Sequence, residues 1–242
     1  LDVDAGSRYE PAAKVGLASL TAGMLDKGIA AQGNAPARDE AAIADAFADV
    51  GASFGGGAGG DRTSLRLRTL SDPAERGPAI ALMTQIVSAP TFPDAVLARD
   101  KQRLVASIRE SLTKPGVLAE RAFGTAIYGT HPYGQTASPE SVESITRDDI
   151  VRYYQANYTA KRAVVTLIGA ISRQEAEAIA VQITQGLLFG AAVLMETAIA
   201  MILLSRILPY KANRWANIII GIVHTASVIA SLFVGGTTPP MY

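Results

Sequence analysis

Two hydrophobic patterns divide the chain into two parts. Up to about residue 185, apolar residues recur at helical spacing or alternate with polar residues in short runs, which is typical of an α/β domain. The stretches from Gly186 to Ser205 and from Ala216 to Gly235 are almost continuously apolar. Each has about the ~20 residues that a helix needs to cross the hydrocarbon core of a bilayer. The pattern therefore predicts a domain at 1–182 followed by a membrane segment at 183–242.

The first part is expected to mix strands and helices. Strands are predicted at the start of the chain, in the glycine-rich stretch 53–60, at 62–70 and, as a buried strand, at 162–171. Helices are predicted at about 13–27, 39–50, 73–88, 94–112 and 117–128, then after the caps Ser138, Thr146 and Ser172. Because the chain begins within a strand and shows no signal peptide, we expect it to be a fragment of a longer protein.

The two long apolar runs predict a transmembrane hairpin with helices at about 186–207 and 215–235. The connector at 206–214 holds three basic residues and a proline, so it should break the helix and face the cytoplasm. The preceding domain would then be periplasmic. A pair of buried helices in a large core is the alternative, although the runs are long and poor in charge for that interpretation.

Two ionisable residues, Glu196 and His224, lie inside the predicted membrane helices. Each is ten positions from a basic residue of the connector, which places it near the bilayer midplane at about 1.5 Å per residue. The two side chains are therefore predicted to pair across the hairpin. The pair either locks the helices together through a hydrogen bond, or forms part of a proton or ion relay or contacts a ligand.

The composition of the chain excludes several kinds of partner and binding site. Its 22 basic and 22 acidic residues balance, so we expect no nucleic-acid partner. The absence of cysteine excludes disulfides, thiolate metal sites and cysteine nucleophiles. The glycine run at 55–60 lacks the lysine and hydroxyl residue of a phosphate-binding loop, so no nucleotide cofactor is expected there.

Several motifs in the first part resemble one peptidase family. They are GSRYEP at 6–11, GLASLTAGMLDKG at 16–28, PTFPDAVLARDKQRLVASIRE at 90–110 and YGTHPYG at 128–134. In this order they resemble the pitrilysin/insulinase-type metallopeptidases, which include the mitochondrial processing peptidases. The resemblance covers about residues 1–182 and implies an α+β fold, an antiparallel-rich sheet with helices packed on one face.

The catalytic residues of that family are replaced in this chain. Active members carry His-x-x-Glu-His on the first helix and a distal glutamate, which bind zinc and activate a water molecule. The corresponding positions are Ser19, Ala22, Gly23 and Ser107. We therefore expect no bound metal, no other cofactor and no enzymatic activity. His131, in the HPYG loop, is expected to pack or form a hydrogen bond within that loop.

The resemblance also predicts a peptide-binding strand. In active relatives the strand after the second helix pairs with the substrate peptide by β-augmentation. The corresponding residues are Gly55, Gly56, Gly57, Ala58, Thr63 and Ser64. The alternative is a glycine-rich strand and turn that binds nothing.

Residues from about 181 onward resemble part of a small uncharacterised bacterial integral-membrane family. We expect the join near residue 182 to be a rearranged reading frame or an assembly artefact rather than a natural fusion. The leading hypothesis is a non-catalytic peptidase homologue that assists an active zinc-peptidase subunit or holds unfolded peptide. The alternative makes the hairpin, in the lipid bilayer, the functional part of a channel, transporter or sensor. Residual peptidase activity is a third hypothesis.

Overall fold

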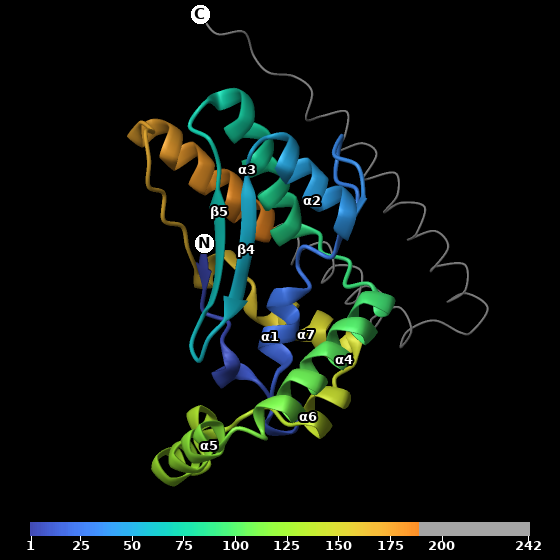
Figure 1. Cartoon of the computed structure of the whole chain (residues 1–242). Coiled ribbons are helices and arrows are strands. Elements are labelled where there is room, and N and C mark those ends of the chain that lie inside the picture. Colours follow the sequence, from blue (N-terminus) through green and yellow to red (C-terminus); the bar gives the residue numbers. More distant parts are fainter. Residues whose placement is uncertain (189–242) are drawn as a thin grey trace, which may run out of the picture.

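A four-stranded antiparallel sheet organises residues 1–188, the part of the chain that this computed structural model describes (Figure 1). Its strand order is β4-β5-β1-β6. The strands are β1 (Asp2–Val3), β4 (Ser53–Ala58), β5 (Thr63–Arg68) and β6 (Ala163–Val164). A separate two-stranded ribbon pairs β2 (Gly28–Ile29) with β3 (Arg38–Asp39).

Helices make up most of the remaining structure. They are α1 (Leu17–Gly23), α2 (Glu40–Asp49), α3 (Pro73–Ser88), α4 (Asp94–Ser111), α5 (Pro115–Tyr128), α6 (Pro139–Glu143), α7 (Arg147–Asn157) and a last helix at 173–188. Short 3-10 turns occupy Ser7–Tyr9, Ala12–Lys14, Pro132–Gly134 and Ala160–Arg162.

Side-chain caps fix where several of these helices begin. Asp72 accepts a hydrogen bond from Ala74 N at the start of α3. Thr146 and Asp149 bond each other's backbone N–H groups at the start of α7, which satisfies two donors that the helix itself leaves free. The predicted helices at 73–88, 94–112 and 117–128 are confirmed to within about two residues at each end.

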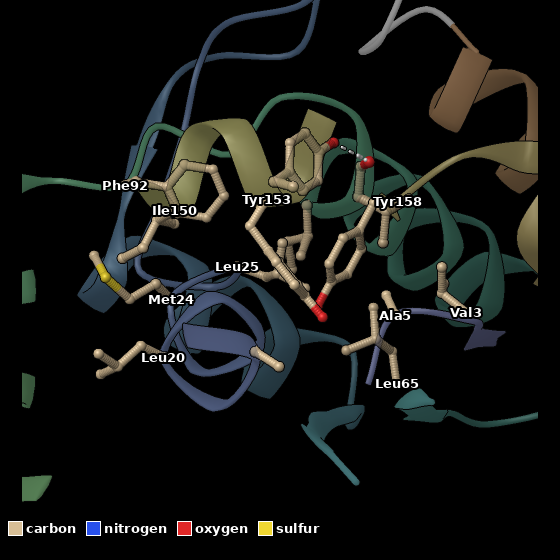
Figure 2. Close-up of a cluster of buried hydrophobic side chains, with 14 of the residues drawn as sticks. Val3, Ala5, Leu20, Met24, Leu25, Leu65, Phe92, Ile150, Tyr153 and Tyr158 are labelled. Atoms are coloured by element: carbon tan, nitrogen blue, oxygen red, sulfur yellow. Dashed lines mark hydrogen bonds between the residues drawn. The ribbon is translucent and has the colours of Figure 1, made fainter. Parts of the chain in front are cut away.

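The core lies between the sheet and the helices that cover its inner face. Val3 and Leu65 from the sheet belong to the same buried cluster as Met24 and Leu25 from the segment that ends α1 (Figure 2). Two tyrosines bring hydroxyls into this core and satisfy them. Tyr153 donates to Gly6 O at 2.8 Å, and Tyr158 donates to Thr63 Oγ1 at 3.2 Å. An α+β unit with helices on one face of an antiparallel sheet is therefore confirmed for residues 1–188.

Two of the predicted elements differ from the structure. The first helix was expected at 13–27, but α1 begins only at Leu17, because Gly16 has φ 105° and turns the chain after the 3-10 turn. The strand expected at 162–171 is reduced to β6, which pairs with β1 alone and ends opposite Asp2, where β1 begins. The prediction that it is buried is wrong, since Ile168 is 94% exposed.

The predicted membrane hairpin lies almost entirely outside the described residues. Its first residues, Gly186 and Leu187, continue the last helix, where Gly186 packs against Thr84 of α3 and Leu187 is buried in the core. Within residues 1–188, no helix combines the length and the apolar character needed to span a bilayer. Glu196, His224 and the connector at 206–214 lie outside the described part, so the hairpin and its orientation stay predictions.

Candidate peptide-binding edge of the sheet

Strand β4 forms an edge of the main sheet. It pairs only with β5, in a register that places Ser53 opposite Arg68, Gly56 opposite Leu65 and Ala58 opposite Thr63. On its inner face, the ring of Phe54 stacks on Phe47 of α2 with ring centroids 5.6 Å apart. This contact fixes β4 to the helical layer, while the other side of its backbone has no neighbouring strand among residues 1–188.

The hydrogen bonds of β5 show which groups of β4 face the open edge. Leu65 and Leu1 exchange two backbone bonds of 2.8 Å each, so the N–H and C=O of Leu65 point toward β1. Because these directions alternate along a strand, Ser64 and Arg66 point toward β4. Their partners Gly57 and Gly55 therefore point toward β5.

The N–H and C=O groups of Phe54, Gly56 and Ala58 consequently point away from β5. No other backbone group in residues 1–188 bonds to these three residues. An edge that presents unpaired donors and acceptors in this way is a template for another extended chain.

Helix α1 lies against this strand and carries three of the four residues that the family resemblance predicts at the zinc-motif positions. Ser19 and Gly23 are exposed on α1, Ala22 is buried, and Ser107 is exposed on α4. Neither hydroxyl is a ligand that zinc prefers, and alanine and glycine offer no donor atom. The residues present therefore do not fit the catalytic zinc of the peptidase family. Within residues 1–188, no group of three histidine, cysteine or acidic side chains could hold a metal ion.

A buried carboxylate holds α1 in place. Glu10 accepts hydrogen bonds from Gly16 N at 3.1 Å and from Ala18 N at 2.6 Å, at the end of the helix where backbone donors are free. Burial raises the pKa of Glu10 above its ordinary value of 4.5, and the two backbone bonds oppose that rise. The sequence pattern alone did not identify this cap, since Glu10 precedes α1 by several residues.

The HPYG loop packs beside the turn that joins β4 to β5. His131 Nδ1 accepts from Tyr133 N at 3.2 Å, and the two rings lie 4.7 Å apart. The hydroxyl of Tyr133 donates to Asp61 at 2.6 Å, and that carboxylate raises the pKa of Tyr133. His131 thus has the loop-packing role that the sequence predicted.

The six residues predicted to bind peptide fall into three groups. Gly56 and Ala58 present backbone groups to the open edge, while Gly55 and Gly57 have their backbone groups bonded to β5 and lie on the exposed outer face. Thr63 and Ser64 belong to the interior strand β5, where the Thr63 hydroxyl donates to Ala5 O at 2.7 Å and the Ser64 hydroxyl to Asp2.

An open groove of about 960 Å³ runs over the outer face of the sheet, from β4 across β5 to the segment at 166–168. Arg66 and Arg68 project from β5 on this face, and both are exposed. Neither guanidinium forms an ion pair or hydrogen bond with any residue in 1–188. The alternation in 62–70 predicts two faces for this strand but not which of them the helices leave uncovered.

Comparison with solved structures identifies this arrangement. A peptidase M16 inactive domain from Pseudomonas fluorescens is 37% identical, with a TM-score of 0.72, over 77% of this chain and 44% of that one. Pitrilysin shares the fold, with a TM-score of 0.64 and 16% identity, over 77% of this chain and 20% of its own.

Sequence comparisons agree for most of the chain. An uncharacterised zinc protease of Rickettsia bellii is 25% identical over 75% of this chain and 43% of its own length. A probable mitochondrial-processing peptidase subunit beta of Schizosaccharomyces pombe is 27% identical over 72% of this chain and 36% of its own. The chain thus spans less than half the length of these curated relatives.

Residues 153–242 also match a family of unknown function, DUF6326. Because no function is described for that family, the match does not support the predicted membrane-protein resemblance. For residues 1–188, the sheet order, the covering helices and the agreement with solved structures lead to one conclusion: this chain has the pitrilysin-type fold of the M16 peptidases, and one of the structures it is similar to is an inactive domain.

Proposed function

We propose that residues 1–188 form a non-catalytic, peptide-holding unit that works beside an active zinc-peptidase subunit. The observation that carries the proposal is the open edge of β4, where Phe54, Gly56 and Ala58 present unpaired backbone groups next to α1. An extended peptide can pair with such an edge because the N–H and C=O groups of its alternate residues form hydrogen bonds with the strand. Main-chain pairing of this kind needs no particular peptide sequence.

Helix α1 lacks the side chains that would bind zinc and activate water, so the bound peptide would not be cleaved here. Ser19, Ala22 and Gly23 occupy the positions of two metal ligands and a general base, and none of the three side chains performs those roles. The described resemblance to an inactive M16 domain accords with this assignment. Cleavage would then depend on a partner subunit that carries an intact zinc motif.

Proline substitution at the edge tests the proposal on the full-length chain. Because Ala58 N–H points away from β5, Ala58→Pro removes an edge donor and introduces a ring there without deleting a bond to β5. Ala58→Ser is the matched control, since it keeps the N–H and a small side chain. Thermal unfolding of both variants checks that each one folds.

The probe is a short fluorescently labelled peptide in which threonine alternates with glutamine, followed by anisotropy. The wild type and Ala58→Ser should bind it, and Ala58→Pro should lose most of the affinity. Equal binding by all three proteins, or no binding by the wild type, would overturn the proposal.

The partner role is tested separately. Added wild-type chain should raise the rate at which a zinc peptidase with an intact motif cleaves the same peptide, and Ala58→Pro should not. Cleavage by the purified chain alone, sensitive to a chelator, would instead support residual peptidase activity. The membrane hairpin and the periplasmic placement of this unit stay predictions.

A further inference from the structure

The three consecutive glycines of β4, Gly55 to Gly57, are not all glycine for the same reason. A Cβ added to Gly56 would lie 2.8 Å from Cδ2 of Leu65 and closer still to the Ser64 carbonyl oxygen, so packing excludes any side chain there. A Cβ added to Gly55 or Gly57 would meet no atom within 4 Å. Neither residue has a positive φ, so backbone conformation does not require glycine at these two positions either.

Because Gly55 and Gly57 have no side chains, the outer face of the sheet is unobstructed at these two residues. We call this surface the glycine floor. An extended peptide added at the edge would place alternate side chains over this floor, because residues that lie opposite each other share a face. Those side chains would lie opposite Gly55 and Gly57, since Phe54, Gly56 and Ala58 form the hydrogen-bonded pairs with the peptide.

The next side chains across the floor belong to β5. Arg66 lies opposite Gly55, and Arg68 lies opposite Ser53, both on the outer face. The added strand would run two strand spacings from β5, which is about 10 Å. A long arginine side chain reaching across a glycine, and an acidic side chain approaching from the peptide, together bridge such a gap. A side chain at Gly55 would block that approach.

Charge in the groove favours an acidic ligand. The guanidiniums of Arg66 and Arg68 have no ion-pair partner in residues 1–188, so a carboxylate of the peptide could bind them without displacing another acidic group. The acidic residue that lines the groove is Asp2, which lies on β1, one strand further away, and accepts a hydrogen bond from Ser64. At roughly three strand spacings from the peptide, its charge is screened at physiological salt.

We infer that the β4 edge selects extended peptides with acidic side chains at alternate positions, which Arg66 recognises across Gly55 and Arg68 recognises across Ser53. The inference rests on the proposed function, because the peptide is bound through the edge of β4. The edge supplies the affinity that is independent of sequence, and the two arginines supply the preference.

The test compares three labelled peptides that differ only at alternate positions, with threonine between glutamate, glutamine or lysine. The full-length chain should bind the glutamate peptide more tightly than the glutamine peptide, by about two- to five-fold for each arginine engaged at a solvent-exposed site. The lysine peptide should bind most weakly. The preference for glutamate should diminish as salt is raised.

Arg66→Gln and Arg68→Gln should each reduce the glutamate preference without changing affinity for the glutamine peptide. Arg152→Gln is the matched control, because Arg152 is an exposed arginine of α7 whose loss changes the net charge by the same amount. Gly55→Val should also abolish the preference by filling the floor.

The outcomes separate the two proposals. If all three peptides bind equally and Ala58→Pro abolishes their binding, the edge holds peptide and the acidic preference is refuted. If no peptide binds, or if Ala58→Pro has no effect, the proposed function fails and the inference fails with it. An equal loss of preference in Arg152→Gln would mean that net charge, rather than Arg66 and Arg68, explains the effect.

Discussion

Replacing Gly56 with alanine should destabilise the protein, whereas the same change at the neighbouring Gly55 should not. The Gly56 methyl group would lie 2.8 Å from Cδ2 of Leu65 and against the Ser64 carbonyl oxygen, which belongs to the β4–β5 ladder. Leu65 is 1% exposed and cannot move out of the way without opening the core. Forcing atoms into a packed site of this kind costs about 1–3 kcal/mol.

The opposing effect is the loss of conformational freedom in the unfolded chain. Replacing glycine with alanine stabilises by about 0.4–1 kcal/mol where the native backbone tolerates the change. For Gly56→Ala the steric cost exceeds this gain, so a net loss of about 1–2 kcal/mol is expected. For Gly55→Ala, whose Cβ would meet open space, only the gain applies. Because the gain applies to both variants, they should differ by the steric cost alone, roughly 1–3 kcal/mol.

Urea unfolding of the wild type and both variants, followed by far-UV circular dichroism, measures this difference. The same order should appear in thermal melting, with a separation of several degrees for a domain of this size at about 2–4 °C per kcal/mol. If Gly56→Ala proves as stable as Gly55→Ala, then the register of Gly56 against Leu65 is wrong, and with it the assignment of which backbone groups face the open edge.

Four further outcomes are expected. Burial raises the pKa of Glu10 above 4.5, so the stabilising contribution of this group is present below pH 4.5 and is lost as pH rises through the folded-state pKa. In urea titrations, the stability of the wild type relative to Glu10→Gln should therefore fall from about pH 4 to neutral pH. Hydrogen bonds from Arg99 and Lys27 lower the pKa of Glu40 to about 2, so Glu40→Gln should cost up to about 1 kcal/mol at neutral pH, and that difference should disappear as pH falls from 4.5 toward 2. Phe47→Ala should cost about 3 kcal/mol in the same assay and should weaken peptide binding, because it removes the ring on which Phe54 stacks. Elemental analysis of the purified chain should find no stoichiometric zinc, and a chelator should leave the melting temperature unchanged; tightly bound zinc with chelator-sensitive proteolysis would refute the non-catalytic assignment.

The amino-acid sequence determined the features that depend on neighbouring residues. Asp72 and Thr146 predict the starts of α3 and α7 from the sequence, because a capping residue acts within one helical turn of its own position. The prediction that Ser19 and Gly23 cannot bind zinc likewise needs only the sequence, since a metal site requires particular side-chain atoms wherever the helix lies. These predictions needed only local chemistry and the order of the motifs.

The tertiary structure decided what depends on distant partners. Glu10 sets the start of α1 by bonding Gly16 and Ala18 across a turn, and the apolar stretch at 162–171 stays largely unpaired because β1 offers it only two residues. Likewise, alternation in the sequence gives β5 two faces, but only the packing of the helices leaves Arg66 exposed beside an open β4 edge. Burial and strand pairing are properties of two surfaces that meet, and a single stretch of sequence describes only one of them.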